Sequence, residues 1–208
     1  MEIRRYESDL LKSNMYLIVE GSRCIAVDPC RRLDVIGDLT VDRILLTHEH
    51  YDHISGVNLW KEATGAPVLC SRACSENIRN ARKNLSSLFE VFCEIQTWIK
   101  LDRIPDADRT YTCTAEETFE DTFEFQWCGH AFRLFEIPGH SMGSIGILVD
   151  DACFFSGDSL LENTETETGL PGGSRKKWND VGRPRVEALP GGITVYPGHF
   201  REFALEER

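Results

Sequence analysis

The chain has 208 residues, with 23 Lys and Arg against 34 Asp and Glu, so its formal net charge is −11. This length suits a domain with a core of its own, and we expect a single domain over residues 1–208. No apolar run approaches the roughly 20 residues of a membrane-spanning helix, and the acidic balance argues against a nucleic-acid partner.

The N-terminal residues and the cysteines predict the compartment. Residues 1–9 lack the positive start and the apolar stretch of a secretory signal. The eight cysteines contain no Cys-x-x-Cys pair. We therefore expect a cytoplasmic protein whose thiols are reduced and mostly buried.

Strands joined by short turns are predicted in the first half of the chain. Apolar, β-prone runs predict a hairpin over residues 15–28, a buried strand over 43–47 and a further strand at 67–70. Residues 57–64 predict a helix that Gly65 closes.

Helical character marks residues 72–100, where we expect a pair of helices over one end of the sheet. Three aromatic residues fall in this segment: Phe89, Phe92 and Trp98. We expect them to pack in the core, and a lid over a pocket is the alternative.

Alternating or wholly apolar runs continue in the second half of the chain. They predict strands in residues 122–127, 131–137, 144–149, 152–156 and 192–196. Two groups of strands with helices among them indicate a core of two sheets, covered by helices on the outer faces.

Five of the six histidines lie in three short segments, each after a predicted strand. The first segment is His48-x-His50-x-Asp52-His53. Side chains alternate along an extended segment, so His48, His50 and Asp52 can point to one side, and a turn at Asp52 brings His53 beside them. Three imidazoles and a carboxylate so close together favour a metal site, since these groups are usual ligands of zinc and nonhaem iron.

Three further candidate ligands follow a glycine at a predicted strand end: His140, Asp158 and His199. Each alone predicts only a turn, but with the first cluster they make seven ligands, enough for two ions. The first ion would be bound by His48, His50 and His140, the second by Asp52, His53 and His199, with Asp158 bridging. Two such ions can share a water that becomes a hydroxide nucleophile, and they can polarise a carbonyl or phosphoryl oxygen.

This ligand order resembles the signature of the metallo-β-lactamase superfamily, in its glyoxalase II-like branch. Similar segments include Val27-Asp28-Pro29 and Tyr196-Pro-Gly-His199, so the resemblance covers almost the whole chain. It implies an α/β fold, the four-layer αββα sandwich, with the metal site at the sheet edges. It also implies that Asp52 orients the attacking water and that Asp28 supports a metal-ligating histidine.

Two features depart from the glyoxalase pattern. His199 follows Asp158 by only 41 positions, and the chain ends nine residues after His199, without the C-terminal helical domain that binds glutathione in glyoxalase II enzymes. A basic cluster over residues 175–185 falls in an expected loop at the rim of the pocket. There it would either steer an anionic substrate or face solvent.

The sequence thus predicts a dinuclear zinc hydrolase of a small-molecule ester, thioester or lactone, with a metal-bridging hydroxide. The alternative is an oxidoreductase similar to the mononuclear iron persulfide dioxygenases, in which His48, His140 and Asp158 bind one iron; a mixed zinc and iron centre is a further option. The acidic charge disfavours a nuclease. A binding module without catalysis would have lost ligands, and none is lost.

Overall fold

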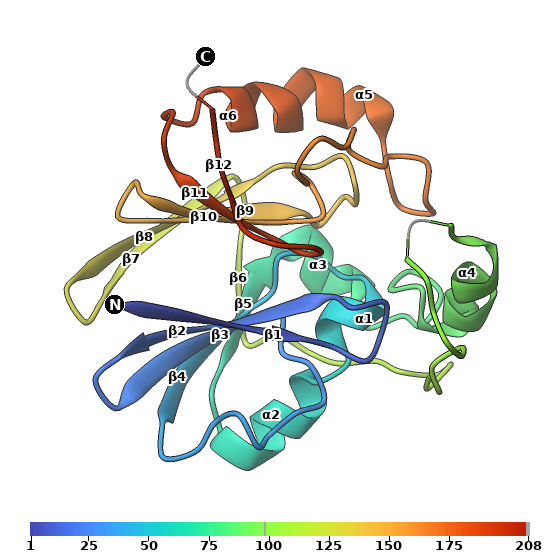
Figure 1. The fold of residues 1–208 in the computed structure, drawn as a ribbon, viewed down its shortest axis with the longest axis horizontal. Helices are drawn as coiled ribbons and strands as arrows, with labels where there is room; N and C mark the ends of the chain where they lie inside the picture. The colour runs from blue at the N-terminus through green and yellow to red at the C-terminus, as the bar shows by residue number, and fades with distance from the viewer. Residues whose placement is uncertain (98, 207–208) are drawn as a thin grey trace.

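Two six-stranded sheets face each other at the centre of the computed structural model, which describes residues 1–97 and 99–206 (Figure 1). The first sheet has the order β1 (Glu2–Glu7), β2 (Asn14–Glu20), β3 (Arg23–Val27), β4 (Thr40–Leu45), β5 (Val68–Ser71) and β6 (Glu117–Phe119). The second has the order β12 (Phe203–Ala204), β11 (Thr194–Pro197), β10 (Cys153–Gly157), β9 (Ile145–Val149), β8 (His130–Glu136) and β7 (Thr122–Trp127). Each sheet is thus built from one continuous half of the chain.

Both sheets are mixed. The expected hairpin is present as the antiparallel pair β2–β3, and β3 to β6 then pair in parallel. In the second sheet β7 to β10 are antiparallel neighbours, whereas β10 and β11 are parallel. Parallel pairing places the ends of β4 and β5, and of β10 and β11, at one edge of their sheets, which is where the candidate ligands follow.

Helices lie on the outer faces of the two sheets and at one end of the sandwich, where helices were expected from residues 72–100 (Figure 1). They are α1 (Tyr51–Ile54), α2 (Val57–Thr64), α3 (Arg72–Asn77), η1 (Ser86–Leu88), α4 (Phe89–Ile95), α5 (Arg175–Lys177), η2 (Trp178–Gly182) and α6 (Arg183–Glu187). Helix α2 has the predicted bounds, and Gly65 ends it with a φ of 69°. The expected loop over residues 175–185 is wrong, because α5, the π-helical turn η2 and α6 follow one another without a break.

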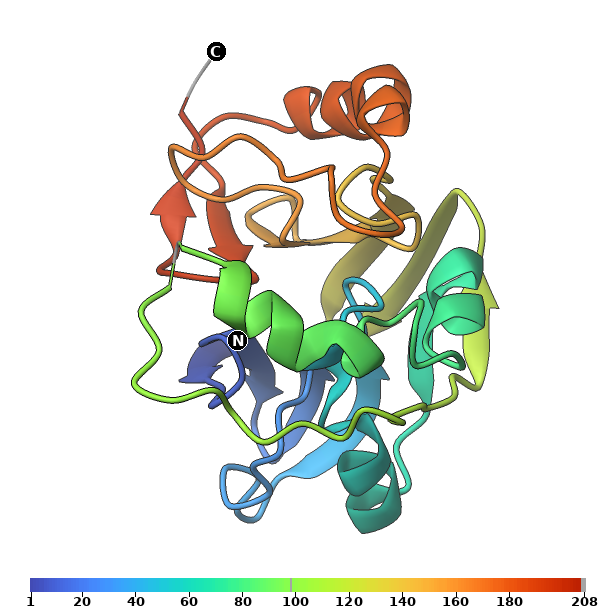
Figure 2. The same ribbon diagram turned by 90° about the vertical axis from the view of Figure 1, so that its right-hand side faces the viewer.

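Alternate side chains of each strand point to opposite faces, and this divides the core into layers. Ile18 and Ile25 belong to the core between the sheets, whereas Leu17 packs outward with Trp60 of α2. On the other side Trp178 of η2 covers the outer face of the second sheet. The molecule is therefore the αββα sandwich that the sequence predicts, and Figure 2 shows its layers from the side.

All eight cysteines lie within the described residues, where none forms a disulfide and six are buried. Trp98, for which core packing was expected, lies outside the described residues. Among residues 1–97 and 99–206, no helix combines the length and the apolar character needed to cross a membrane.

Candidate metal centre

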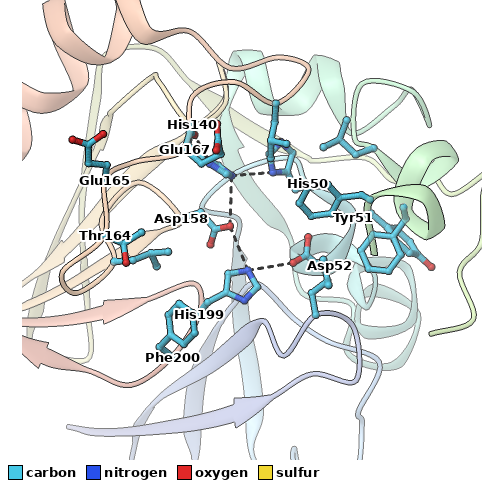
Figure 3. Close-up of a pocket in the computed structure, with 16 residues that line it drawn as sticks. His50, Tyr51, Asp52, His140, Asp158, Thr164, Glu165, Glu167, His199 and Phe200 are labelled. Atoms are coloured by element: carbon cyan, nitrogen blue, oxygen red, sulfur yellow. Dashed lines mark hydrogen bonds and ion pairs between the residues drawn. The ribbon is translucent and has the colours of Figure 1, made fainter. Parts of the chain in front are cut away.

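All seven candidate ligands lie together where strands of both sheets end, and Figure 3 labels those that line the cavity, namely His50, Asp52, His140, Asp158 and His199. The segment after β4 and the short helix α1 supply four of them, and the ends of β8, β10 and β11 supply one each. The seven are His48, His50, Asp52, His53, His140, Asp158 and His199. The structure thus brings together residues that are up to 151 positions apart, from His48 to His199.

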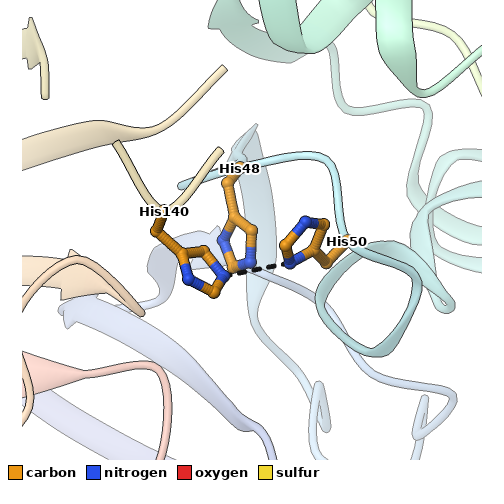
Figure 4. A group of neighbouring side chains, drawn as sticks. All are labelled: His48, His50 and His140. Carbon is orange, nitrogen blue, oxygen red and sulfur yellow. Dashed lines mark hydrogen bonds between the residues drawn. The ribbon is translucent and has the colours of Figure 1, made fainter. Parts of the chain in front are cut away.

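Three histidines form one group (Figure 4). Ring nitrogens of His48, His50 and His140 all lie within 4.8 Å of one another. His140 Nε2 is 3.0 Å from His50 Nδ1, and all three side chains are buried. Three buried imidazoles that converge in this way are the donor set expected around one cation.

Two histidines and a carboxylate form a second group. Asp52 Oδ2 lies 3.5 Å from both His53 Nε2 and His199 Nε2. Helix α1 begins at Tyr51, so the chain turns before Asp52 and not at it. Asp52 therefore faces His53 and His199 instead of sharing a side with His48 and His50.

Asp158 lies between the two groups. Its Oδ1 is 3.4 Å from His53 Nε2, and its Oδ2 is 3.4 Å from His199 Nε2 and 3.5 Å from His140 Nε2. A Cβ at position 198 would collide with Asp158 Oδ1, so the neighbouring turn requires Gly198. One carboxylate thus contacts both groups.

A buried carboxylate behind the ligands sets the orientation of two imidazoles. The Thr47 hydroxyl donates to Asp28 Oδ2 at 2.5 Å, so it can only accept the hydrogen bond from His48 Nδ1 at 3.0 Å. His53 Nδ1 donates to Asp28 Oδ2 at 3.1 Å. With both Nδ1 atoms protonated, the Nε2 atoms face the site, where each would offer a lone pair to a cation once it carries no proton.

The third imidazole is fixed by the backbone. His140 Nδ1 donates to the carbonyl oxygen of Glu167 at 2.9 Å, which leaves Nε2 directed toward His50 and Asp158. Trp178 holds this turn from behind, since a Cβ on Gly139 would lie 2.6 Å from the Trp178 Cβ. The helix over residues 175–187 therefore supports a candidate ligand from the outside of the sheet.

Several inward-facing polar atoms have no hydrogen-bond partner among the described residues. They include the Nε2 atoms of His48, His50 and His53, and Oδ1 of Asp158, all of them inaccessible to solvent. A buried polar atom left without a partner costs about 1–3 kcal/mol. Four such atoms in one site fit a centre that is completed by cations bound to these nitrogens and oxygens.

The buried charges also fit cation binding. Burial lowers the pKa of His50 to about 3, so that this imidazole is neutral. Burial also acts to lower the pKa values of His53 and His199, but the carboxylates of Asp52 and Asp158 outweigh it. They raise the pKa of His199 to about 9 and hold that of His53 well above its usual value. The second group therefore attracts positive charge.

Glu49 is a buried carboxylate that the sequence prediction overlooked. It is 1% exposed and accepts hydrogen bonds at 2.7 Å from the Ser141 hydroxyl and the Asn77 side-chain amide. Burial raises its pKa, and these two hydrogen bonds oppose the rise. Since Glu49 follows His48 and Ser141 follows His140, this contact ties two ligand segments together. Its place between two histidines was the only sequence signal.

A cavity of about 260 Å³ adjoins the two groups. Candidate ligands form its floor, and mainly apolar residues from α4, the β1–β2 connection and residues 161–170 form its walls. Tyr51 lines it with its ring, because the Tyr51 hydroxyl faces away and accepts a hydrogen bond from the Asp108 amide at 3.0 Å. Phe89 and Phe92 also line it, although Phe89 belongs to the adjoining core as well.

The basic cluster does not rim this cavity, so that expectation is wrong. None of its five cationic side chains is among the lining residues. Arg185 donates to the Glu136 carbonyl oxygen at 2.9 Å and pairs with Asp121, while Lys176 pairs with Asp180. These charges act on the outer face of the second sheet.

Comparisons with known proteins agree with this geometry. The family model of the metallo-beta-lactamase superfamily matches residues 8–199. A probable metallo-hydrolase of Streptococcus pyogenes is 28% identical over 207 residues, covering 96% of this chain and 84% of that protein. The hydroxyacylglutathione hydrolase of Ectopseudomonas mendocina is 27% identical over 192 residues, covering 85% of this chain but only 56% of that protein.

Solved structures share the fold. BLEG-1, a B3 metallo-beta-lactamase, superposes with a TM-score of 0.83 at 22% identity, covering 98% of this chain and 94% of that one. TTHA1623 in a di-iron-bound form gives a TM-score of 0.74 at 24% identity, covering 97% and 94% of the two chains. At such identities these likenesses concern the fold.

Proposed function

The chain belongs to the metallo-beta-lactamase superfamily of metallo-hydrolases, and we propose that it is a dinuclear zinc hydrolase of a small-molecule ester, thioester or lactone. The observation that carries this proposal is the pair of three-residue ligand groups with Asp158 in contact with both. In this assignment His48, His50 and His140 bind one cation. Asp52, His53 and His199 would hold the other, and Asp158 would contribute to both.

The chemistry follows from the donor set. Two zinc ions would supply a water of lowered pKa as nucleophile and would polarise the carbonyl of the substrate. The protein holds its imidazoles in the correct tautomer through Asp28 and the Glu167 carbonyl. Asp52 lines the cavity, where its carboxylate would accept a hydrogen bond from the attacking water. The acyl–oxygen or acyl–sulfur bond then breaks, giving a carboxylic acid and an alcohol or thiol.

A glutathione thioester is the less suitable substrate. Among the described residues that line the cavity, none is Lys or Arg. The two carboxylates of glutathione would therefore meet no cationic side chain there. A smaller substrate without such charges fits the cavity better.

Metal analysis of protein purified without added metal tests the proposal. We expect about two zinc ions per chain, loss of 4-nitrophenyl acetate hydrolysis on chelation, and recovery on addition of zinc. His130→Ala is the matched control, because His130 binds Asp150 and Glu20 away from the cavity, and this variant should keep both ions. Less than one equivalent of metal, together with no activity restored by zinc, would refute the hydrolase assignment.

The same measurement separates the oxidoreductase alternative. One iron per chain, held by His48, His140 and Asp158, with oxygen uptake on a persulfide, would replace the proposed activity. The similar fold of the di-iron form of TTHA1623 makes iron worth measuring beside zinc.

A further inference from the structure

Three bulky apolar residues of the cavity wall have a left-handed backbone. The φ angles are 49° for Leu11, 65° for Leu85 and 67° for Phe200, and all three residues line the cavity. Leu and Phe rarely adopt this conformation, since it brings Cβ close to the following carbonyl oxygen. Such strain is kept where the surrounding structure imposes it, and it gathers at functional sites.

These three residues differ from the other non-glycine residues with positive φ in their side chains. Among the described residues, the other non-glycine positions with positive φ are Lys12, Asp28, Asp121, Cys128, Asp150, Asp151 and Asn163, and of all ten only three carry a Leu or Phe side chain. Those three come from separate segments, yet they converge on one cavity. The backbone is strained where it presents large apolar groups to the site.

Leu85 shows that this wall is more than ordinary core. It is only 7% exposed, yet within the described part of the chain it belongs to none of the hydrophobic core clusters. Phe92 of α4 also lines the cavity and is partly buried. Their side chains therefore contribute an apolar surface to the cavity.

The charges of the lining residues also favour an uncharged ligand. None of its sixteen lining residues is Lys or Arg, and its acidic members besides the candidate ligands are Glu165 and Glu167. Both glutamates are exposed, so their field is screened by water. They offer nothing to a carboxylate that lies against the apolar wall, away from the candidate ligands, where it would lose its hydration without gaining a partner.

We propose that the substrate carries an uncharged apolar acyl group, which lies against Leu11, Leu85 and Phe92 while its carbonyl faces the candidate ligands. This inference rests on the proposed hydrolase function and adds its substrate class. Each methylene buried in such a wall raises the specificity constant by up to about fourfold. Four additional methylenes should therefore raise kcat/KM at least about tenfold, even with partial burial.

Matched esters test the inference on the zinc-loaded protein. We expect kcat/KM for 4-nitrophenyl hexanoate to exceed that for the acetate at least about tenfold. The mono-4-nitrophenyl ester of adipic acid has a similar chain ending in a carboxylate, and its kcat/KM should fall at least about tenfold below that of the hexanoate. Equal rates for acetate and hexanoate, or a preference for the adipate, would overturn the proposal.

Variants locate the acyl site. Phe92→Ala and Leu85→Gly should each reduce the hexanoate-to-acetate ratio of kcat/KM by about fivefold or more. Val91→Ala is the matched control, because Val91 is the neighbour of Phe92 on α4, is 55% exposed and does not line the cavity. An unchanged ratio in both wall variants would place the acyl group elsewhere.

A binding measurement separates this inference from the hydrolase proposal. Saturation-transfer NMR with hexanamide, and with adipamic acid as its anionic counterpart, requires no turnover. Binding of hexanamide but not adipamic acid, weakened by Leu85→Gly, would support the apolar site even if no ester were hydrolysed. Equal binding of both amides, or binding of neither, would reject it.

Discussion

Asp52 is the residue whose replacement most directly separates metal binding from turnover. It contacts His53 and His199 and also lines the cavity, whereas the first histidine group does not depend on it. We expect Asp52→Ala to lower kcat more than about 100-fold, beyond the usual effect of residues that only support ligands, with partial loss of metal. Metal content and steady-state kinetics check this, with exposed Asp180→Ala as control. Full activity in Asp52→Ala would contradict the dinuclear assignment.

Glu49 is expected to act by positioning the ligand segments. Glu49→Ala would leave the Ser141 hydroxyl and the Asn77 amide without their buried acceptor. The free energy of unfolding of the metal-free protein should fall by about 2–3 kcal/mol, and zinc affinity should fall about tenfold. Urea unfolding and zinc titration measure the two effects.

Two further variants distinguish a specific role of Glu49 from a general effect of losing a carboxylate. Glu49→Gln retains an acceptor oxygen and should recover part of both losses, whereas Glu94→Ala on the exposed face of α4 should change neither. If zinc affinity were unchanged in correctly folded Glu49→Ala, the residue would serve stability alone.

The secondary-structure elements that could be predicted are those whose ends are marked by glycine and proline in the local sequence. The turns Pro138-Gly-His140 and Pro197-Gly-His199 place their histidines directly after strands, and α2 ends at a glycine, as expected. Strand β1 was not predicted, because charged residues dominate Glu2–Glu7, and its strand structure depends on antiparallel pairing with β2. The helix over residues 175–187 was also missed.

That helix contains residues that usually interrupt helices. Gly182 ends the π-helical turn, and Pro184 lies in the first turn of α6, where a missing amide hydrogen is tolerated. Trp178 packs against Gly139 and the sheet, so tertiary contacts stabilise a segment whose local sequence indicates a loop. The cavity wall could not be predicted either, since Leu11, Leu85 and Phe200 come from distant segments and line one cavity only in the folded chain.

Strand β2 of the first sheet holds the turn that carries His199. The Asn14 side chain donates to the carbonyl oxygens of Pro197 and Phe200 at 2.9 and 2.8 Å, and the Tyr16 hydroxyl donates to Pro197 at 2.7 Å. Tyr16→Phe should lower the free energy of unfolding by about 1 kcal/mol, and Asn14→Ala by about 2 kcal/mol. Urea denaturation measures both.

The effect should extend to the metal centre. Because the turn precedes His199, we expect Asn14→Ala to weaken the second zinc ion more than the first in a zinc titration. Tyr6→Phe, on the partly exposed strand β1, is the control and should change stability by less than about 0.5 kcal/mol. Equal weakening of both ions would show that the turn is not held in this way.

For the whole molecule, the centre depends on two sheets that come from different halves of the chain. The first sheet supplies four candidate ligands and the second supplies three, and each group contains ligands from both sheets, so a shift between the sheets would pull both groups apart. Contacts between the sheets far from the cavity therefore bear on its geometry. An apolar core lies between the sheets, and hydrogen bonds such as that of the Trp127 indole also join them.

Asp42 provides one such link. This side chain on β4, 17% exposed, accepts hydrogen bonds at 2.7 Å from Arg23 on β3 and from the Trp127 indole on β7 of the other sheet. Burial acts to raise the pKa of Asp42, but these two hydrogen bonds outweigh it and hold the pKa below its ordinary value of 3.8. The stabilisation is therefore fully present above about pH 4 and is lost as the pH falls through the lowered pKa.

Asp42→Ala should lower the free energy of unfolding by about 2 kcal/mol at pH 7, because the indole loses its acceptor. Asp42→Asn keeps that acceptor and should cost under about 1 kcal/mol, because Arg23 is mostly exposed. In urea unfolding from pH 7 to pH 3, the gap between wild type and Asp42→Asn should shrink below pH 4, and a constant gap would show that the ionised carboxylate does not contribute.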